Sequence, residues 1–168
     1  AYHLFQVLYD DVKMIGKLLN VKPSDVQKKI VSIKTNEDLS QIKINELGKK
    51  LALLYLKNLN SKELDTSKTK FYLADCSDIE INQIKILSDL IKNQHENSIS
   101  ILLKKNLEVI NCYVGVSKQC KHRYNAKKII EELNNEFSSK GGGSPTFGSS
   151  VILNQNMKVV LSYINKIL

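Results

Sequence analysis

Apolar residues in the first third of the chain recur every three or four positions, the spacing that gathers them on one face of a helix. This spacing predicts a helix over residues 4–19, with the apolar residues Leu4, Phe5, Leu8, Val12, Ile15 and Leu19 on one face. Pro23 suits a first helical turn and Asp25 places a negative charge near a helix start, so a second, short helix is expected over 23–33. The two helices would form a hairpin.

The run from Ile42 to Leu59 repeats this spacing through Leu47, Leu51, Leu54 and Tyr55. Such a helix packs either back onto the first helix or against another chain. A dimer seam calls for a strict seven-residue repeat, which these positions lack. Packing within the chain is therefore favoured, and a homodimer stays the alternative.

Residues 60–70 are polar and rich in Ser, Thr and Asp, a composition typical of a linker. We therefore expect a helical subdomain over residues 1–62, a linker over 63–70 and a globular subdomain over 71–168. In the last of these the apolar spacing changes.

The globular part is predicted to be a small α+β fold. The pattern indicates strands over 71–74, 98–103 and 108–116, the last two joined by a polar bend at 104–106, and helices over 81–91, 125–137 and 151–168, with a glycine and serine stretch before the last helix. The expected order is β-α-β-β-α-loop-α. A three-stranded sheet covered by helices would bury these faces, with a right-handed first crossover if its strands are parallel.

Composition narrows the class of protein. The chain has 168 residues, 42% of them apolar, which excludes disorder as a whole. Its apolar runs fall short of the roughly 20 residues of a membrane span, and no leader pattern opens the chain, so a cytoplasmic protein without a membrane partner is expected. Cys76, Cys112 and Cys120 are odd in number and widely spaced, which favours reduced thiols. The start at Ala1, without Met, suggests a piece of a longer protein.

The net charge of +8 is unevenly distributed. Between Ile101 and Lys128 the basic residues Lys104, Lys105, Lys118, Lys121, Arg123, Lys127 and Lys128 stand against one acid, Glu108, and no acid follows Glu136. Lysines that meet phosphates release counterions, so this asymmetry favours a polyanionic partner. A merely solvated surface remains the alternative.

A second candidate feature is the run Lys140-Gly141-Gly142-Gly143-Ser144-Pro145. Consecutive glycines can take backbone conformations closed to other residues and let a phosphate or sugar approach the main chain. The same letters also suit a flexible linker. The run matches neither the phosphate loop that ends in Gly-Lys-Ser/Thr nor the dinucleotide fingerprint.

Three segments together resemble the carboxy-terminal part of bacterial-type alanyl-tRNA synthetases. They are the helical stretch Ile15–Val26, the run Tyr113-Val114-Gly115-Val116-Ser117-Lys118, and the glycine run followed by an amphipathic segment. This globular part is the DHH-associated fold, which DHH phosphoesterases also carry. The resemblance implies a non-catalytic part of an alanine-tRNA ligase that holds the elbow of tRNA(Ala), beside catalytic and editing domains of the parent chain. ATP, Mg and Zn would belong to those domains, and no cofactor is expected here.

The residues that the resemblance and the charge pattern suggest for tRNA binding are Lys118, Lys121, Arg123, Lys127, Lys128, Lys140, Gly141, Gly142, Gly143 and Ser144. Tyr124 and Phe147 are candidate stacking groups, since exposed aromatics stack on unpaired bases. Phe147 could equally fill the core beneath the loop. No metal site is expected, because the Cys120-Lys121-His122 cluster lacks further ligands.

The chain also departs from the family pattern. Ser144 stands where synthetases commonly have a basic residue and phosphoesterases often have a His. A contact with RNA could be lost there. Without that His or an Asp-His-His triplet, a phosphoesterase is the weaker alternative, and a dimerisation module of the synthetase is the other.

Overall fold

The structure is a computed structural model that describes residues 2–64 and 68–168. The chain divides into two compact units, Ala1–Leu47 and Gly48–Leu168. The domain limits expected from the sequence, with a linker over 63–70, stay a prediction, and residues 65–67 of that linker lie outside the described residues.

The first unit is helical. It contains α1 (Tyr2–Leu18), the short 3-10 helix η1 (Pro23–Asp25) and the beginning of α2 (Val26–Asn58). The predicted helix over 4–19 is confirmed. The predicted end of the second helix at residue 33 is wrong, because α2 continues through residues 34–41. This polar stretch contains neither Gly nor Pro, so nothing in it interrupts a helix exposed to water.

The second unit contains a mixed sheet with the strand order β1-β2-β3-β4-β6-β5. The strands are β1 (Ser61–Leu64), β2 (Thr69–Asp75), β3 (Ser98–Asn106), β4 (Val109–Val116), β5 (Lys140–Gly143) and β6 (Phe147–Leu153). Only β2 and β3 pair in parallel, through α3 (Ile81–Gln94); the other pairs are antiparallel. The α+β class is confirmed, while the described residues form six strands instead of three.

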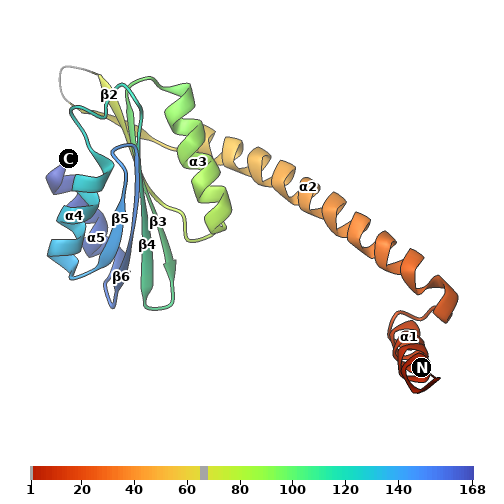
Figure 1. The fold of residues 1–168 in the computed structure, drawn as a ribbon. Coiled ribbons are helices and arrows are strands. Elements are labelled where there is room, and N and C mark those ends of the chain that lie inside the picture. The colour runs from red at the N-terminus through yellow and green to blue at the C-terminus, as the bar shows by residue number, and fades with distance from the viewer. Residues whose placement is uncertain (1, 65–67) are drawn as a thin grey trace. The chain divides into compact units, whose positions relative to one another are not determined.

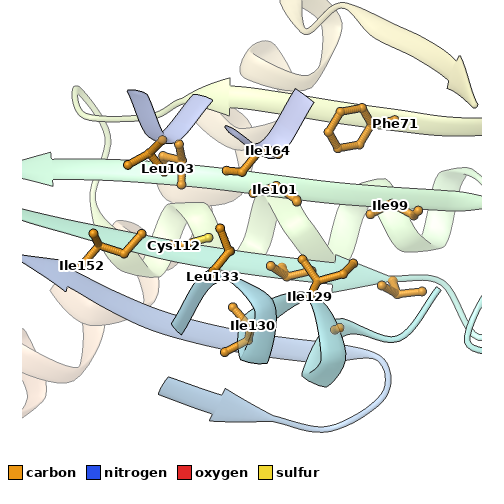
Figure 2. Close-up of a cluster of buried hydrophobic side chains, with 14 of the residues drawn as sticks. Phe71, Ile99, Ile101, Leu103, Cys112, Ile129, Ile130, Leu133, Ile152 and Ile164 are labelled. Carbon is orange, nitrogen blue, oxygen red and sulfur yellow. The ribbon is translucent and has the colours of Figure 1, made fainter. Parts of the chain in front are cut away.

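Helices cover both faces of this sheet (Figure 1). α4 (Ala126–Phe137) and α5 (Met157–Ile167) close one core with inward residues of β3 such as Ile99, Ile101 and Leu103 (Figure 2). α3 and the end of α2 close the other, where Leu102 of β3 meets Leu87. β3 is buried on both faces from Ser98 to Lys104, where the apolar run 101–103 feeds both cores and Ser98 and Ser100 are buried polar residues.

Three segments differ from the sequence-based expectation. Residues 61–64 of the expected polar stretch form β1, which pairs with β2. The glycine run is strand β5, and residues 151–153, expected in a helix, end strand β6. Helix α5 starts only at Met157, where the side chain of Asn156 accepts a hydrogen bond from the N–H of Lys158.

The run 42–59 is also less buried than expected. Ala52 and Leu56 enter the core against α3, whereas Leu47 and Leu54 stay 56% and 58% exposed. The prediction that this whole stripe packs within the chain is therefore wrong for the described residues.

The cysteines and the helix lengths can also be compared with the expectations from composition. Cys76, Cys112 and Cys120 are buried and free of disulfides. None of the helices in the described residues is long and apolar enough to cross a membrane.

Candidate nucleic-acid interface

Most of the basic residues predicted to bind tRNA lie around one end of the sheet. Lys118, Lys121 and Arg123 are exposed on the loop 117–125 between β4 and α4, and Lys127 and Lys128 are exposed on the first turn of α4. We call these five residues the cationic rim. The structure thus brings together side chains that the sequence spreads over eleven positions.

Backbone hydrogen bonds hold the loop under the rim. The N–H of Ser117 donates to the carbonyl oxygen of Ser98 at 3.0 Å, and the N–H of Cys120 donates to that of Ser117 at 3.0 Å. The N–H of Tyr124 donates to the carbonyl oxygen of Cys120 at 2.8 Å. A loop tied in this way to β3 presents its lysines from a fixed base.

The amino end of α4 is already satisfied within the chain. Asn125 caps it by accepting from the N–H groups of Lys127 and Lys128, at 3.0 and 3.4 Å. The N–H of Ala126 donates to the carbonyl oxygen of Pro145, and that of Ile129 to Asn125. Because the first-turn N–H groups already have hydrogen-bond partners, they do not bind an anion directly. An anion here would be attracted by the lysine side chains and the helix dipole.

The rim side chains are exposed to solvent. Lys127 reaches Glu131 at 3.8 Å, with both side chains about half exposed, an arrangement that contributes little stability. Lys121, Arg123 and Lys128 line a pocket of about 240 Å³ with Tyr124. Tyr124 is half-buried against the core, so its ring offers only part of its face for stacking.

The glycine run is an ordered edge strand, not a linker. β5 pairs with β6 from Lys140 opposite Val151 to Gly143 opposite Gly148. No glycine among the described residues has positive φ, so conformational freedom is not what these positions require. A Cβ on Gly141 would lie 2.2 Å from the carbonyl oxygen of Ser149, and one on Gly143 2.3 Å from that of Phe147. Close approach of β6 therefore demands glycine at these two positions, whereas a Cβ on Gly142 meets nothing within 4 Å.

The ladder shows which backbone groups face outward. The N–H of Ser144 donates to the carbonyl oxygen of Phe147, so Ser144 and Phe147 form a hydrogen-bonded pair. Alternation along an antiparallel ladder then points the N–H and C=O groups of Gly143 and Gly141 away from β6. Consistently, the carbonyl oxygen of Gly141 accepts from the side-chain amide of Asn134 at 3.1 Å. The outer edge of β5 thus presents main-chain donors to the surface.

The hairpin turn after β5 uses two of the predicted site residues in its own structure. The hydroxyl of Ser144 accepts from the N–H of Phe147 at 3.2 Å. Phe147 is half-buried beside the second core, and the ammonium of Lys92 lies 5.5 Å from its ring centroid. Phe147 therefore packs against this core, and its role in base stacking stays a prediction.

Lys140 stands apart from the cationic rim. It begins β5, whereas the rim meets the end of this strand, where the carbonyl oxygen of Thr146 accepts from the N–H of Val116 at 3.0 Å. Four residues of strand span roughly 10 Å. The predicted residues thus form a rim and a glycine edge, with Lys140 at the far end of that edge.

Some residues around this end of the sheet were not expected from the sequence. Lys92, Asn93 and Gln119 line a further pocket beside Lys118. They come from an exposed helix face and a loop, so only the tertiary fold brings them together. In the Cys120-Lys121-His122 run, where no metal site was expected, the thiol of Cys120 lies 3.7 Å from the side-chain oxygen of Asn97. In residues 2–64 and 68–168 no group of three or more His, Cys, Asp or Glu side chains is placed to hold a metal ion.

Comparison with known proteins shows a shared fold. No protein-family model matches the chain. The C-Ala domain of the alanyl-tRNA synthetase of Aquifex aeolicus is similar, with a TM-score of 0.56 and 17% identity, over 64% of this chain and 95% of that domain. A DHH-domain structure from a protein described as belonging to a family of ribosomal proteins gives a TM-score of 0.55 and 20% identity, over 84% of this chain and 34% of that one. The chain therefore has the fold of C-Ala and DHH-associated domains.

Proposed function

We propose that the unit Gly48–Leu168 is a tRNA-binding module without catalytic activity of its own. The observation that carries this proposal is the cationic rim, five exposed cations on a firmly held loop and helix start next to the turn that ends the glycine strand. Exposed lysines on a fixed scaffold neutralise backbone phosphates without reading sequence. The fold shared with a C-Ala domain supports the same assignment.

The rim and the glycine edge suit a folded RNA better than a regular duplex. Structured RNA is recognised through shape, phosphates and 2′-hydroxyls. The outward N–H groups of Gly141 and Gly143 are donors that a phosphate or ribose oxygen can reach, because every residue of β5 is exposed. We propose the elbow of tRNA(Ala) as the ligand and assistance to aminoacylation and editing as the role, with those reactions performed by other domains of an alanine-tRNA ligase.

Salt dependence tests the proposal directly. The chain is titrated with folded tRNA(Ala) transcript at several salt concentrations, and the slope of log K against log salt is measured. Five phosphate contacts predict a slope of roughly −3.5 to −4.5. A flat response, or no binding at low salt, would refute an electrostatic tRNA site. Alanine-dependent ATP turnover by this chain would refute the non-catalytic assignment.

A homodimer through the helices is the second candidate. Large apolar side chains stay exposed on α1 and α2, among them Phe5 at 76%, Leu8 at 54% and Ile42 at 57%. Exposed apolar surfaces of this kind mark contact sites with other proteins. Light scattering decides: a mass twice that of the chain, returned to a monomer by Leu8→Lys, supports the dimer.

A further inference from the structure

A pocket of about 390 Å³ lies next to the rim and extends to the end of α3. Its polar lining consists of Asp89, Lys92, Asn93, Glu96, Lys118, Gln119 and Thr146. A volume of this order is at the lower end of the range for small-molecule sites. None of the residues from α3 was foreseen as part of an RNA site.

We propose that this pocket receives one unstacked nucleotide of the bound RNA. The proposal rests on the proposed function and extends it from phosphate contacts to a base contact. The side-chain amides of Asn93 and Gln119 each provide donors and an acceptor, the combination that hydrogen-bonds the edge of an unpaired base. Both residues are exposed, so neither amide is committed to the core.

The charges of the lining favour a nucleotide over a cluster of phosphates. Lys92 and Lys118 bring two positive charges, and Asp89 and Glu96 bring two negative ones. A site for several phosphates would repel them through its carboxylates. A single nucleotide carries one phosphate for a lysine and a polar base for the amides and carboxylates, which matches this mixed lining.

The walls of the pocket are held before any ligand binds. The ammonium of Lys92 lies 2.7 Å from a carboxylate oxygen of Asp89 and also stands over the ring of Phe147. On the other side, the N–H of Val116 donates to the carbonyl oxygen of Thr146, so the strand end and the hairpin turn move together. Such preorganisation lowers the entropic cost of binding.

Chain continuity links this pocket to the rim. Lys118 belongs to both, and Gln119 follows it on the same loop. An RNA backbone that follows Lys121 and Lys118 therefore passes the mouth of the pocket. A base turned out of the stack at that point meets Asn93 and Gln119.

The test uses a stem-loop RNA with one bulged nucleotide, made with A, C, G, U or an abasic residue at the bulge. The wild-type chain is expected to bind the abasic RNA about tenfold more weakly than the best base. The double variant Asn93→Ala/Gln119→Ala should bind all five RNAs with the same affinity. Its slope of log K against log salt should equal that of the wild type. Asn82→Ala, an exposed position at the other end of α3, is the matched control and should keep the base dependence.

Two further results separate this proposal from the proposed function. Equal binding of all five RNAs by the wild type, with affinity that still falls with salt, overturns the pocket and leaves the rim intact. Nucleoside 5′-monophosphates are also titrated while the side-chain amide NMR signals of Asn93 and Gln119 are followed. Shifts of these signals in a chain that fails to bind tRNA would support the pocket and refute the proposed function. Unshifted amide signals, together with equal affinity for all five bulge RNAs, would refute the proposed nucleotide pocket.

Discussion

The side-chain amide of Asn134 donates a hydrogen bond of 3.1 Å to the carbonyl oxygen of Gly141, joining the last turns of α4 to the edge strand. The side-chain oxygen of Asn134 accepts from the hydroxyls of Ser150 at 2.6 Å and Ser139 at 2.8 Å. One side chain thus ties β5, β6 and the turn after α4. This relationship explains why a run of three glycines is a strand here and not a linker.

Asn134→Ala should therefore loosen β5. The variant removes the link to Gly141 and the short hydrogen bonds of two hydroxyls, which keep only their other partners, so we expect a loss of about 1–3 kcal/mol in the free energy of unfolding. Urea denaturation measures it. Asn165→Ala is the control, because Asn165 makes an exposed bond to its own helix at Leu161, and its effect should stay within about 0.5 kcal/mol. Equal effects of the two variants would contradict the assigned role.

The three glycines should respond differently to substitution. A Cβ on Gly141 collides with backbone atoms of Ser149 and Ser150, so Gly141→Ala should cost about 1–3 kcal/mol of stability. A side chain on Gly142 enters open space, so Gly142→Val should leave the unfolding midpoint unchanged. If RNA lies along this edge, the same variant should weaken tRNA binding about tenfold, or roughly 1.4 kcal/mol. Paired denaturation and binding titrations measure both effects, and unchanged tRNA affinity in Gly142→Val would remove the glycine edge from the interface.

Local pattern sufficed for the elements whose sequence carries a clear period. α3 and α4 were predictable because their apolar spacing agrees with the fold. The β3–β4 hairpin was predictable because two apolar runs meet at a polar bend. The α+β class followed from these elements.

The errors arise where tertiary pairing overrides composition. Gly141 and Gly143 are in a strand because they pair with β6, which passes so close that only glycine fits, and this neighbour is invisible in the local sequence. β1 is a polar segment that pairs with an apolar strand. The grouping of exposed cations in the candidate site was predictable from charge, whereas the pocket at Asn93 and Gln119 depends on the packing of α3 and was not.

Single lysines of the rim should change the salt dependence of RNA binding by a defined amount. Lys121→Ala and Lys128→Ala each remove one exposed cation from the wall of the same pocket. Each should lower the magnitude of the salt slope by roughly 0.7–0.9 if the lysine meets a phosphate. Lys105→Ala is the matched control, since Lys105 is exposed at the opposite end of the sheet next to the β3–β4 turn. A slope that drops as much in the control as in the rim variants would argue against a localised site.

Alkaline pH should destabilise the fold through its buried thiols. Complete burial raises the pKa of Cys112 from 9.0 to about 12. Between these values the unfolded chain releases a proton that the folded chain retains, so the stability contributed by the neutral thiol is full below pH 9 and declines as the pH rises toward 12. By pH 10 this one group should lower the free energy of unfolding by about 1.4 kcal/mol relative to pH 8.

The variant Cys112→Ala isolates this effect, because alanine leaves no ionisable group at the same core position. It should be less stable than the wild type at pH 8, since it leaves a small cavity in the core shown in Figure 2. Between pH 8 and pH 10, however, it should lose about 1.4 kcal/mol less than the wild type does. Urea denaturation of both proteins at the two pH values, in the presence of a reductant, measures the difference. Parallel losses would show that the Cys112 thiol is not held neutral by the fold.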